Sequence, residues 1–195
     1  MTKSLFKLPS LRRLGLLVLV IVPAASWALV KPVRVLAPTW AGVTCSTAAL
    51  CTDDPAQLAS ASALYQEAQA FVAGKLGSLQ GEPRVVFCAS QACADAFGLG
   101  ERSAVTVGTV GSVIGPRAWK PYYVRHELIH QLQGQRLGVV SMLFKPSWLI
   151  EGMAYALSED PRPVLAEPWQ DYRARFQAWR DGLADTDVWQ AARAF

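Results

Sequence analysis

Apolar and polar positions change their spacing several times along the chain, and each change predicts a different element. An alanine-rich stretch follows Asp54 and Pro55, an acid and a proline that favour a helix start, and Gly77 breaks it. This stretch predicts a helix up to about residue 76. Short segments rich in β-branched residues predict three or four strands. The segments lie at residues 33–36, at 84–88, and at 103–107 together with 110–114.

The second half of the chain has mainly helical spacing. A helix is predicted from about residues 119–123 to Gly138, and a second one opens at Pro146 and closes at residues 160–163, where two prolines stand. Two shorter helices follow, one through Trp169, Tyr172, Phe176 and Trp179 and the other at residues 188–195. Because the strands precede the helices, the predicted fold class is α+β.

The first thirty residues have the layout of an export signal. Basic residues precede an uncharged apolar stretch at residues 14–30, and the residues before Ala28 suit a signal peptidase. Residues 1–30 are predicted to be a signal peptide cleaved after Ala28, or an uncleaved anchor, because seventeen residues lie at the lower limit of a bilayer span. Both interpretations place residues 31–195, predicted to form a single domain, outside the cytoplasm. The basic residues are Lys3, Lys7, Arg12 and Arg13.

The charge distribution argues against a nucleic-acid partner. The chain has 19 basic and 15 acidic residues, but four of the basic ones lie within the first thirteen positions. The remainder is formally neutral and lacks the basic stripe that would meet phosphates. Nucleic acid is therefore not expected as a partner, and residues 14–30 offer a possible membrane association.

The four cysteines indicate an oxidising compartment. Four cysteines allow three pairings, and we favour Cys45 with Cys51 and Cys88 with Cys93, since each bridge would close a loop, 44–53 in the first case, next to a predicted strand. A four-cysteine zinc site is the alternative, although no Cys-x-x-Cys pair is present.

Candidate chemistry is concentrated in one predicted helix and the start of the next. His126 and His130 are four residues apart, so on a helix they lie about 40° from each other and can hold one ion. Glu127 lies beside them, where a carboxylate can take a proton from the attacking water. Glu151, twenty-one residues after His130, is the natural third ligand. Three ligands and one open position are typical of catalytic zinc.

These residues resemble the gluzincin metallopeptidases, typified by thermolysin and the M1 aminopeptidases. The resemblance rests on residues 124–131 and 148–154 and covers a minority of the chain. It implies that His126, His130 and Glu151 bind one Zn²⁺ per chain and that Glu127 is the general base. It also implies a zincin-like fold, in which a small sheet packs on the zinc helix.

The chain departs from these relatives in two places. Thermolysin-like enzymes carry an aspartate four residues after the glutamate ligand to orient a zinc histidine, and here that position is Tyr155. Glu159 or Asp160 is the candidate replacement, since ligands usually need such a partner. The segment that holds the free amino end in the M1 aminopeptidases is also missing, so an endopeptidase is favoured over an exopeptidase.

Two further expectations concern substrate. A phenol near the metal can stabilise an oxyanion, and Tyr155 is the preferred candidate because it lies on the face of Glu151; Tyr122 and Tyr123 are weaker candidates. Residues 105–114 would be an edge strand that binds extended peptide, or else an ordinary hairpin turning at Gly108 or Gly111.

The predicted function is that of an exported zinc metallopeptidase, an endopeptidase that cleaves a peptide or protein substrate with a zinc-activated water and Glu127 as base. The alternative is a non-catalytic zinc-containing peptide-binding scaffold or an assembly factor of the cell envelope. The presence of Glu127 favours catalysis, because a degenerate enzyme is expected to have lost it.

Overall fold

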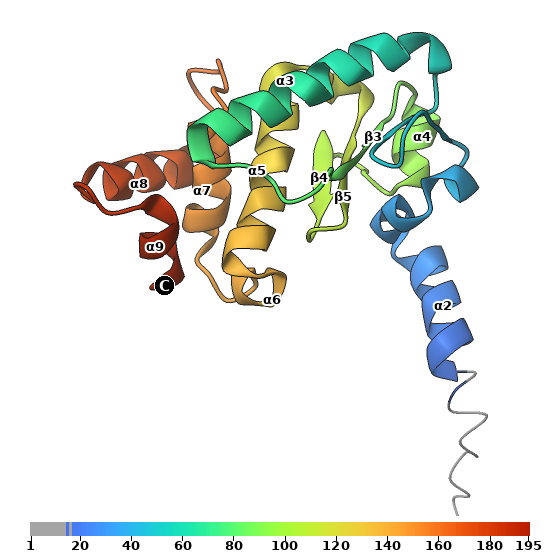
Figure 1. The fold of residues 1–195 in the computed structure, drawn as a ribbon, viewed down its shortest axis with the longest axis horizontal. Coiled ribbons are helices and arrows are strands. Elements are labelled where there is room, and N and C mark those ends of the chain that lie inside the picture. Colours follow the sequence, from blue (N-terminus) through green and yellow to red (C-terminus); the bar gives the residue numbers. More distant parts are fainter. Residues whose placement is uncertain (1–14, 16) are drawn as a thin grey trace, which may run out of the picture.

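The computed structural model describes residue 15 and residues 17–195 (Figure 1). The sheet in this part of the chain has five strands in the order β1-β2-β3-β5-β4. Strands β2, β3 and β5 are parallel, whereas β1 and β4 are antiparallel to their neighbours and form the two edges. The strands are β1 (Thr44–Cys45), β2 (Leu50–Thr52), β3 (Arg84–Phe87), β4 (Ala104–Val107) and β5 (Gly111–Ile114). The predicted α+β class is confirmed, as are the strands predicted at 84–88, 103–107 and 110–114.

Both faces of the sheet are covered, so its side chains alternate between two hydrophobic cores. In β3, Val85 and Phe87 belong to the first core and Val86 to the second. In β5, Ile114 belongs to the first core and Val113 to the second. The first core contains the long helices, and the second contains the disulfide-bonded cysteines.

Two long helices cover the first face of the sheet. Helix α3 (Leu58–Leu76) follows the short 3-10 turn η4 (Pro55–Gln57), whose cap Asp54 accepts a hydrogen bond from the Ala56 N–H at 3.0 Å. Helix α5 (Pro121–Leu137) starts at a proline after the 3-10 turn η5 (Pro116–Ala118) and ends at Gly138, whose φ of 87° suits glycine. Both helices were predicted from sequence.

Three more helices lie beyond α5, on the side away from the sheet (Figure 1). Helix α7 (Ser147–Leu157) packs between α5 and α8 (Trp169–Asp181), and α9 (Val188–Arg193) ends the fold. The tight contact of α7 with α8 depends on Gly152, because a Cβ there would overlap the carbonyl oxygen of Tyr172. These three helices confirm the predicted elements, whereas α4 (Gln91–Ala96) and α6 (Val139–Met142) were not predicted.

The strand predicted at residues 33–36 is wrong. These residues belong to the 3-10 helix η2 (Lys31–Leu36), which is followed by η3 (Pro38–Ala41). Val35 is fully buried in the second core, while the Arg34 side chain donates to the carbonyl of Ala96 at 2.6 Å. The β-branched residues therefore satisfy a packing requirement without entering the sheet, because β-propensity mainly reflects packing.

The loop predicted at residues 44–53 is also partly wrong, since it contains β1 and β2. Strand β2 is fully buried in the interior of the sheet and pairs with β3. Its three residues are too few to show a period, so sequence alone did not separate it from a loop. Both predicted disulfides are confirmed: Cys45 is bonded to Cys51 within this segment, and Cys88 is bonded to Cys93 further along the chain.

The N-terminal part of the described chain is an extended arm. Residues Leu17–Ile21 form the π-helix η1 and Val22–Leu29 form α2, which projects from the body of the molecule (Figure 1). The four basic residues of the predicted export signal lie outside the described residues. Among residues 15 and 17–195, no helix combines the length and the apolar character needed to cross a membrane. The two disulfides indicate a compartment outside the cytoplasm.

Candidate metal centre

Helices α5 and α7 bring the three predicted ligands together. The Nε2 atoms of His126 and His130 lie 3.1 Å apart, and each lies 3.6 Å from Oε2 of Glu151. The histidines are one turn apart on α5, and α7 crosses that face with Glu151 directed at them. His126, His130 and Glu151 thus form a group that could hold one metal ion.

The surroundings of this group favour a bound cation. The side chains of His126 and His130 are only 11% and 12% exposed. Burial alone lowers the pKa of His130, but hydrogen bonding and the charge of Glu151 prevail and raise this pKa to about 9. Burial alone would raise the pKa of Glu151, yet its hydrogen bonds with the two histidines hold this pKa well below its usual range. Without a metal, the proton on His130 is the positive charge that stabilises Glu151. A cation can replace this proton, because metal binding releases protons from its ligands.

Gln133 orients His130. The amide nitrogen of Gln133 donates to the backbone carbonyl of Ile150 at 2.8 Å, so its oxygen faces Nδ1 of His130 at 2.7 Å. A backbone carbonyl only accepts, and this fixes the amide orientation. Nδ1 of His130 must then carry a proton, so in the neutral, metal-binding form of the ring the lone pair is on Nε2 and is directed toward Glu151 and His126.

Glu159 and Asp160 do not orient a histidine, so this prediction is wrong. Glu159 pairs instead with Lys75 at 2.6 Å and with Arg125 at 3.3 Å, at the end of α7. Asp160 forms a forked ion pair with Arg162. Both acids follow the last turn of α7, and their nearest cations hold them away from the ligand group.

A chain of hydrogen bonds holds the carboxylate of Glu127, which is 6% exposed. Its Oε2 accepts from the hydroxyl of Thr106 on β4 at 2.6 Å. A hydroxyl has one hydrogen, so Ser112 on β5 must donate to Thr106 across their 2.8 Å contact. The amide of Gln131 donates in turn to Ser112 at 3.2 Å. The predicted base is thereby fixed to the sheet.

The ligand group and Glu127 line one cavity of about 670 Å³. Strand β4 forms one wall, and the segment that follows α7 forms the opposite one. Four tyrosine or tryptophan residues and two arginines give the cavity an amphipathic lining. They are Tyr122, Tyr123, Tyr155, Trp169, Arg102 and Arg162.

Tyr155 lies beside the group of candidate ligands, as predicted from its position on α7. Its ring packs edge-on against the ring of His126, with 4.5 Å between centroids. Burial, and then the charge of Glu151, raise the pKa of Tyr155 to about 12, so its hydroxyl keeps its proton at neutral pH. Tyr122 and Tyr123 lie at the start of α5 under the guanidinium of Arg162.

Only part of the predicted edge strand is an edge. Strand β4 lies at the end of the described sheet and contributes residues to the cavity wall, whereas β5 lies between β3 and β4. Residues 104–114 form the hairpin offered as the alternative, with its turn at Gly108, Thr109 and Val110. The hairpin is thus confirmed and β4 is an edge strand, while the binding of extended peptide there stays a prediction.

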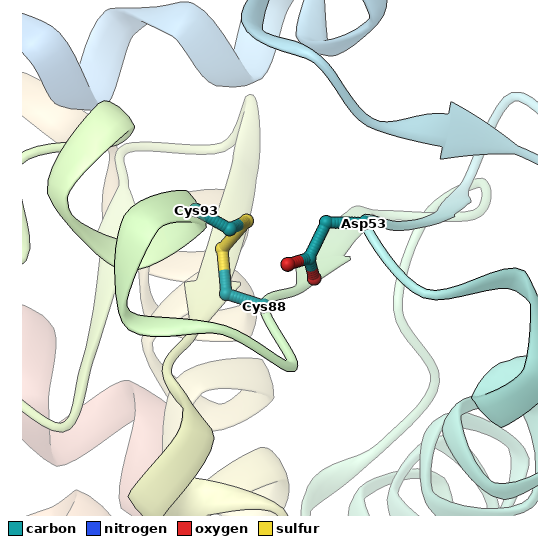
Figure 2. A group of neighbouring side chains, drawn as sticks. All are labelled: Asp53, Cys88 and Cys93. Carbon is teal, nitrogen blue, oxygen red and sulfur yellow. A yellow bond between two sulfur atoms is a disulfide. The ribbon is translucent and has the colours of Figure 1, made fainter.

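A second group of potential ligands, Asp53, Cys88 and Cys93, has a structural role (Figure 2). The two sulfur atoms are bonded to each other, which removes their lone pairs from thiolate chemistry. The Asp53 carboxylate accepts from the backbone N–H groups of Ala89 and Ser90 at 2.6 and 3.1 Å. Asp53 thus fixes the loop that enters α4, and the alternative of a four-cysteine zinc site is not formed.

Sequence reasoning missed several residues of the site. Gln133 could have been found, since it lies three residues after His130 on the same helical face. Thr106 and Ser112 could not, because their contact with Glu127 depends on how the sheet packs against α5. The orientation of Arg162 depends equally on a loop between two helices.

Comparison with protein-family models, with curated proteins and with solved structures finds no match for this chain. The interpretation of the site therefore rests on its own geometry and chemistry.

Proposed function

We propose that the protein is an exported zinc metallopeptidase, an endopeptidase of gluzincin type. The observation that carries the proposal is the convergence of His126, His130 and Glu151 beside a buried, hydrogen-bonded Glu127 in one cavity. A structural metal site needs no general base. A carboxylate fixed next to the ligand group is what hydrolysis needs.

The donor set suits zinc. Two ligands at about 2.0–2.1 Å from a tetrahedral ion lie about 3.3 Å from each other. The observed separations of 3.1 and 3.6 Å fall on either side of that value. Two imidazoles and one carboxylate also make up a known catalytic zinc set. When bound, the ion supplies Lewis acidity that polarises the scissile carbonyl and acidifies water.

The protein's own groups then have separate roles. Glu127 accepts a proton as the water oxygen attacks the carbonyl carbon, and it delivers the proton to the amine nitrogen as the C–N bond breaks. Thr106 keeps the carboxylate in place. The protonated hydroxyl of Tyr155 is the proposed donor to the developing oxyanion.

Strand β4 is the proposed substrate-binding edge. Its pairing with β5 leaves its other edge without a partner strand among the described residues. An extended peptide can add to such an edge through backbone hydrogen bonds, which are tolerant of sequence. This supports a peptide or protein as the substrate and an internal bond as the point of cleavage.

The test uses the protein made in an oxidising host, with zinc per chain and cleavage of fluorescently labelled casein as readouts. Wild type and Glu127→Gln are expected to bind one zinc each, with cleavage at least 100-fold slower in the variant. Glu151→Gln is the matched ligand variant and is expected to lose zinc as well. One zinc with no cleavage by the wild type would favour the non-catalytic peptide-binding scaffold, and a folded protein without zinc affinity would refute the ligand assignment.

A further inference from the structure

Helix α6 and the two residues after it expose an apolar surface. Val139, Val140, Leu143 and Phe144 are 40%, 70%, 78% and 82% exposed. Gly108, in the turn between β4 and β5, lies against Val139 at the edge of this surface. We call the four residues Val139, Val140, Leu143 and Phe144 the α6 patch. No charged residue occurs between Gly138 and Phe144, and Ser141 is the one polar side chain in this stretch.

The N-terminal arm exposes a second apolar surface. The large apolar side chains from Val18 to Val22 are about half or more exposed, and Leu29 is 82% exposed. At the base of the arm, the ring of Trp27 packs against Trp40, with centroids 5.8 Å apart, and Trp40 is itself 82% exposed. Tryptophan is enriched at the level of lipid headgroups, where one side of its ring is wet and the other is apolar.

Helices α2 and α6 lie on the same side of the body, opposite α3 (Figure 1). A lysine follows each apolar stretch, Lys145 after Phe144 and Lys31 after Val30. The ammonium of Lys31 donates to the backbone carbonyl of Asp95 at 3.2 Å, so Lys145 is the lysine that can reach an anionic headgroup while the neighbouring apolar residues enter the acyl layer.

We propose that the α6 patch docks on an anionic phospholipid bilayer, in the same plane that receives the N-terminal arm. A flat apolar medium covers both surfaces at once, whereas a protein partner would need two separate apolar sites at a matching distance. Met142, on the same short helix, lines the metal cavity. Docking therefore sets the cavity close to the bilayer surface and favours substrates presented there. The proposal does not depend on zinc or on peptidase activity.

The test places a reporter on the patch of the full chain. All four cysteines form disulfides, so Leu143→Cys provides a unique thiol for an NBD fluorophore. Ala63→Cys, at an exposed position of α3, is the matched control on the opposite side. The full chain is made in a cell-free oxidising system without signal peptidase and is added to vesicles of phosphatidylcholine and phosphatidylglycerol that carry nitroxide-labelled lipid.

The label at residue 143 is expected to shift to the blue and to lose at least half of its emission to the nitroxide, while the label at residue 63 stays unchanged. Vesicles that bind the chain but quench neither label, or both alike, would overturn the proposal, as would a failure to bind. Protection of the residue 143 label from aqueous iodide by casein alone, and not by vesicles, would also overturn it and would assign the patch to an apolar protein segment.

Discussion

At the scale of single residues, hydrogen bonds fix the orientation of two side chains of the site, those of His130 and Glu127. Gln133 turns the lone pair of His130 toward the other ligands, and Thr106 occupies one oxygen of Glu127. The second oxygen of Glu127 stays available for a proton. Each of these two contacts can be removed without deleting a candidate ligand or the proposed base, and each therefore supports a separate prediction.

Thr106→Val should lower kcat for casein cleavage by about 10- to 100-fold, the value of a hydrogen bond to a charged group. KM should stay the same, since the hydroxyl points at Glu127 and away from the substrate edge. Thr106→Ser keeps the hydroxyl and should restore most of the activity. Full activity in Thr106→Val, at one zinc per chain, would show that the contact is structural only.

Gln133→Leu should weaken zinc binding by about 10- to 100-fold, because the proton on Nδ1 of His130 loses its acceptor. Competition with a chromophoric chelator measures this change. Gln135→Leu is the control, since Gln135 lies on the same helix but bonds to Gln80. Equal zinc affinity in the two variants would contradict the role given to Gln133.

At the scale of elements, the ligand group depends on how closely helices α5, α7 and α8 pack. Glu151 and Gly152 are adjacent on α7: one faces the histidines, and the other faces α8. The single glycine lets α8 approach so closely that no side chain fits between the two backbones. This approach supports α7 from behind and so holds Glu151 in position.

Gly152→Ala should therefore destabilise the fold by about 1–3 kcal/mol, as overpacking does, despite the better helix propensity of alanine. The added Cβ would also lie 2.8 Å from Cβ of Phe176. Gly74→Ala in α3 is the control: nothing lies within 4 Å of its Cβ, and it should stabilise by about 0.5–1 kcal/mol. Urea unfolding midpoints measure both, and equal midpoints would refute the packing argument.

The same scale shows what could be predicted from sequence. Helices α3, α5 and α7 have local start and stop signals, so their ranges and the pairing of His126 with His130 could be predicted. Strand β2 could not be predicted, because its three residues are a strand through their pairing with β3, which is distant in sequence. The 3-10 helix at Lys31–Leu36 was taken for a strand, since the burial of Val35 in the second core has no local signal.

At the scale of the whole molecule, the sheet separates two cores with different roles. The first core contains α5 and α7, which carry the candidate metal ligands, and the second contains Cys51, Cys88 and Cys93. The proposed metal binding and the disulfides should therefore stabilise opposite faces of one sheet. The two contributions should be separable by experiment.

Removal of the metal should lower the melting temperature. A ligand that binds only the folded state at 100 times its Kd contributes about 2.7 kcal/mol, which is roughly 5–10 °C for a chain of this length. Scanning calorimetry with zinc and with a chelator measures the difference. Glu127→Gln should keep this shift and Glu151→Gln should lose most of it; a shift that persists in Glu151→Gln would point to zinc bound elsewhere.

Loss of the disulfides should destabilise the face of the sheet that packs in the second core. The bridges span sequence separations of 6 and 5, and closing loops this short stabilises by about 2 kcal/mol each. The sum is a large fraction of the about 5–15 kcal/mol that holds a typical domain together. The double variants Cys45→Ala/Cys51→Ala and Cys88→Ala/Cys93→Ala should each lower the urea midpoint, yet still bind one zinc, because no ligand lies in the second core. If either double variant lost zinc while remaining folded, the two faces would be coupled through the sheet, and the separation of roles argued from the two cores would be wrong.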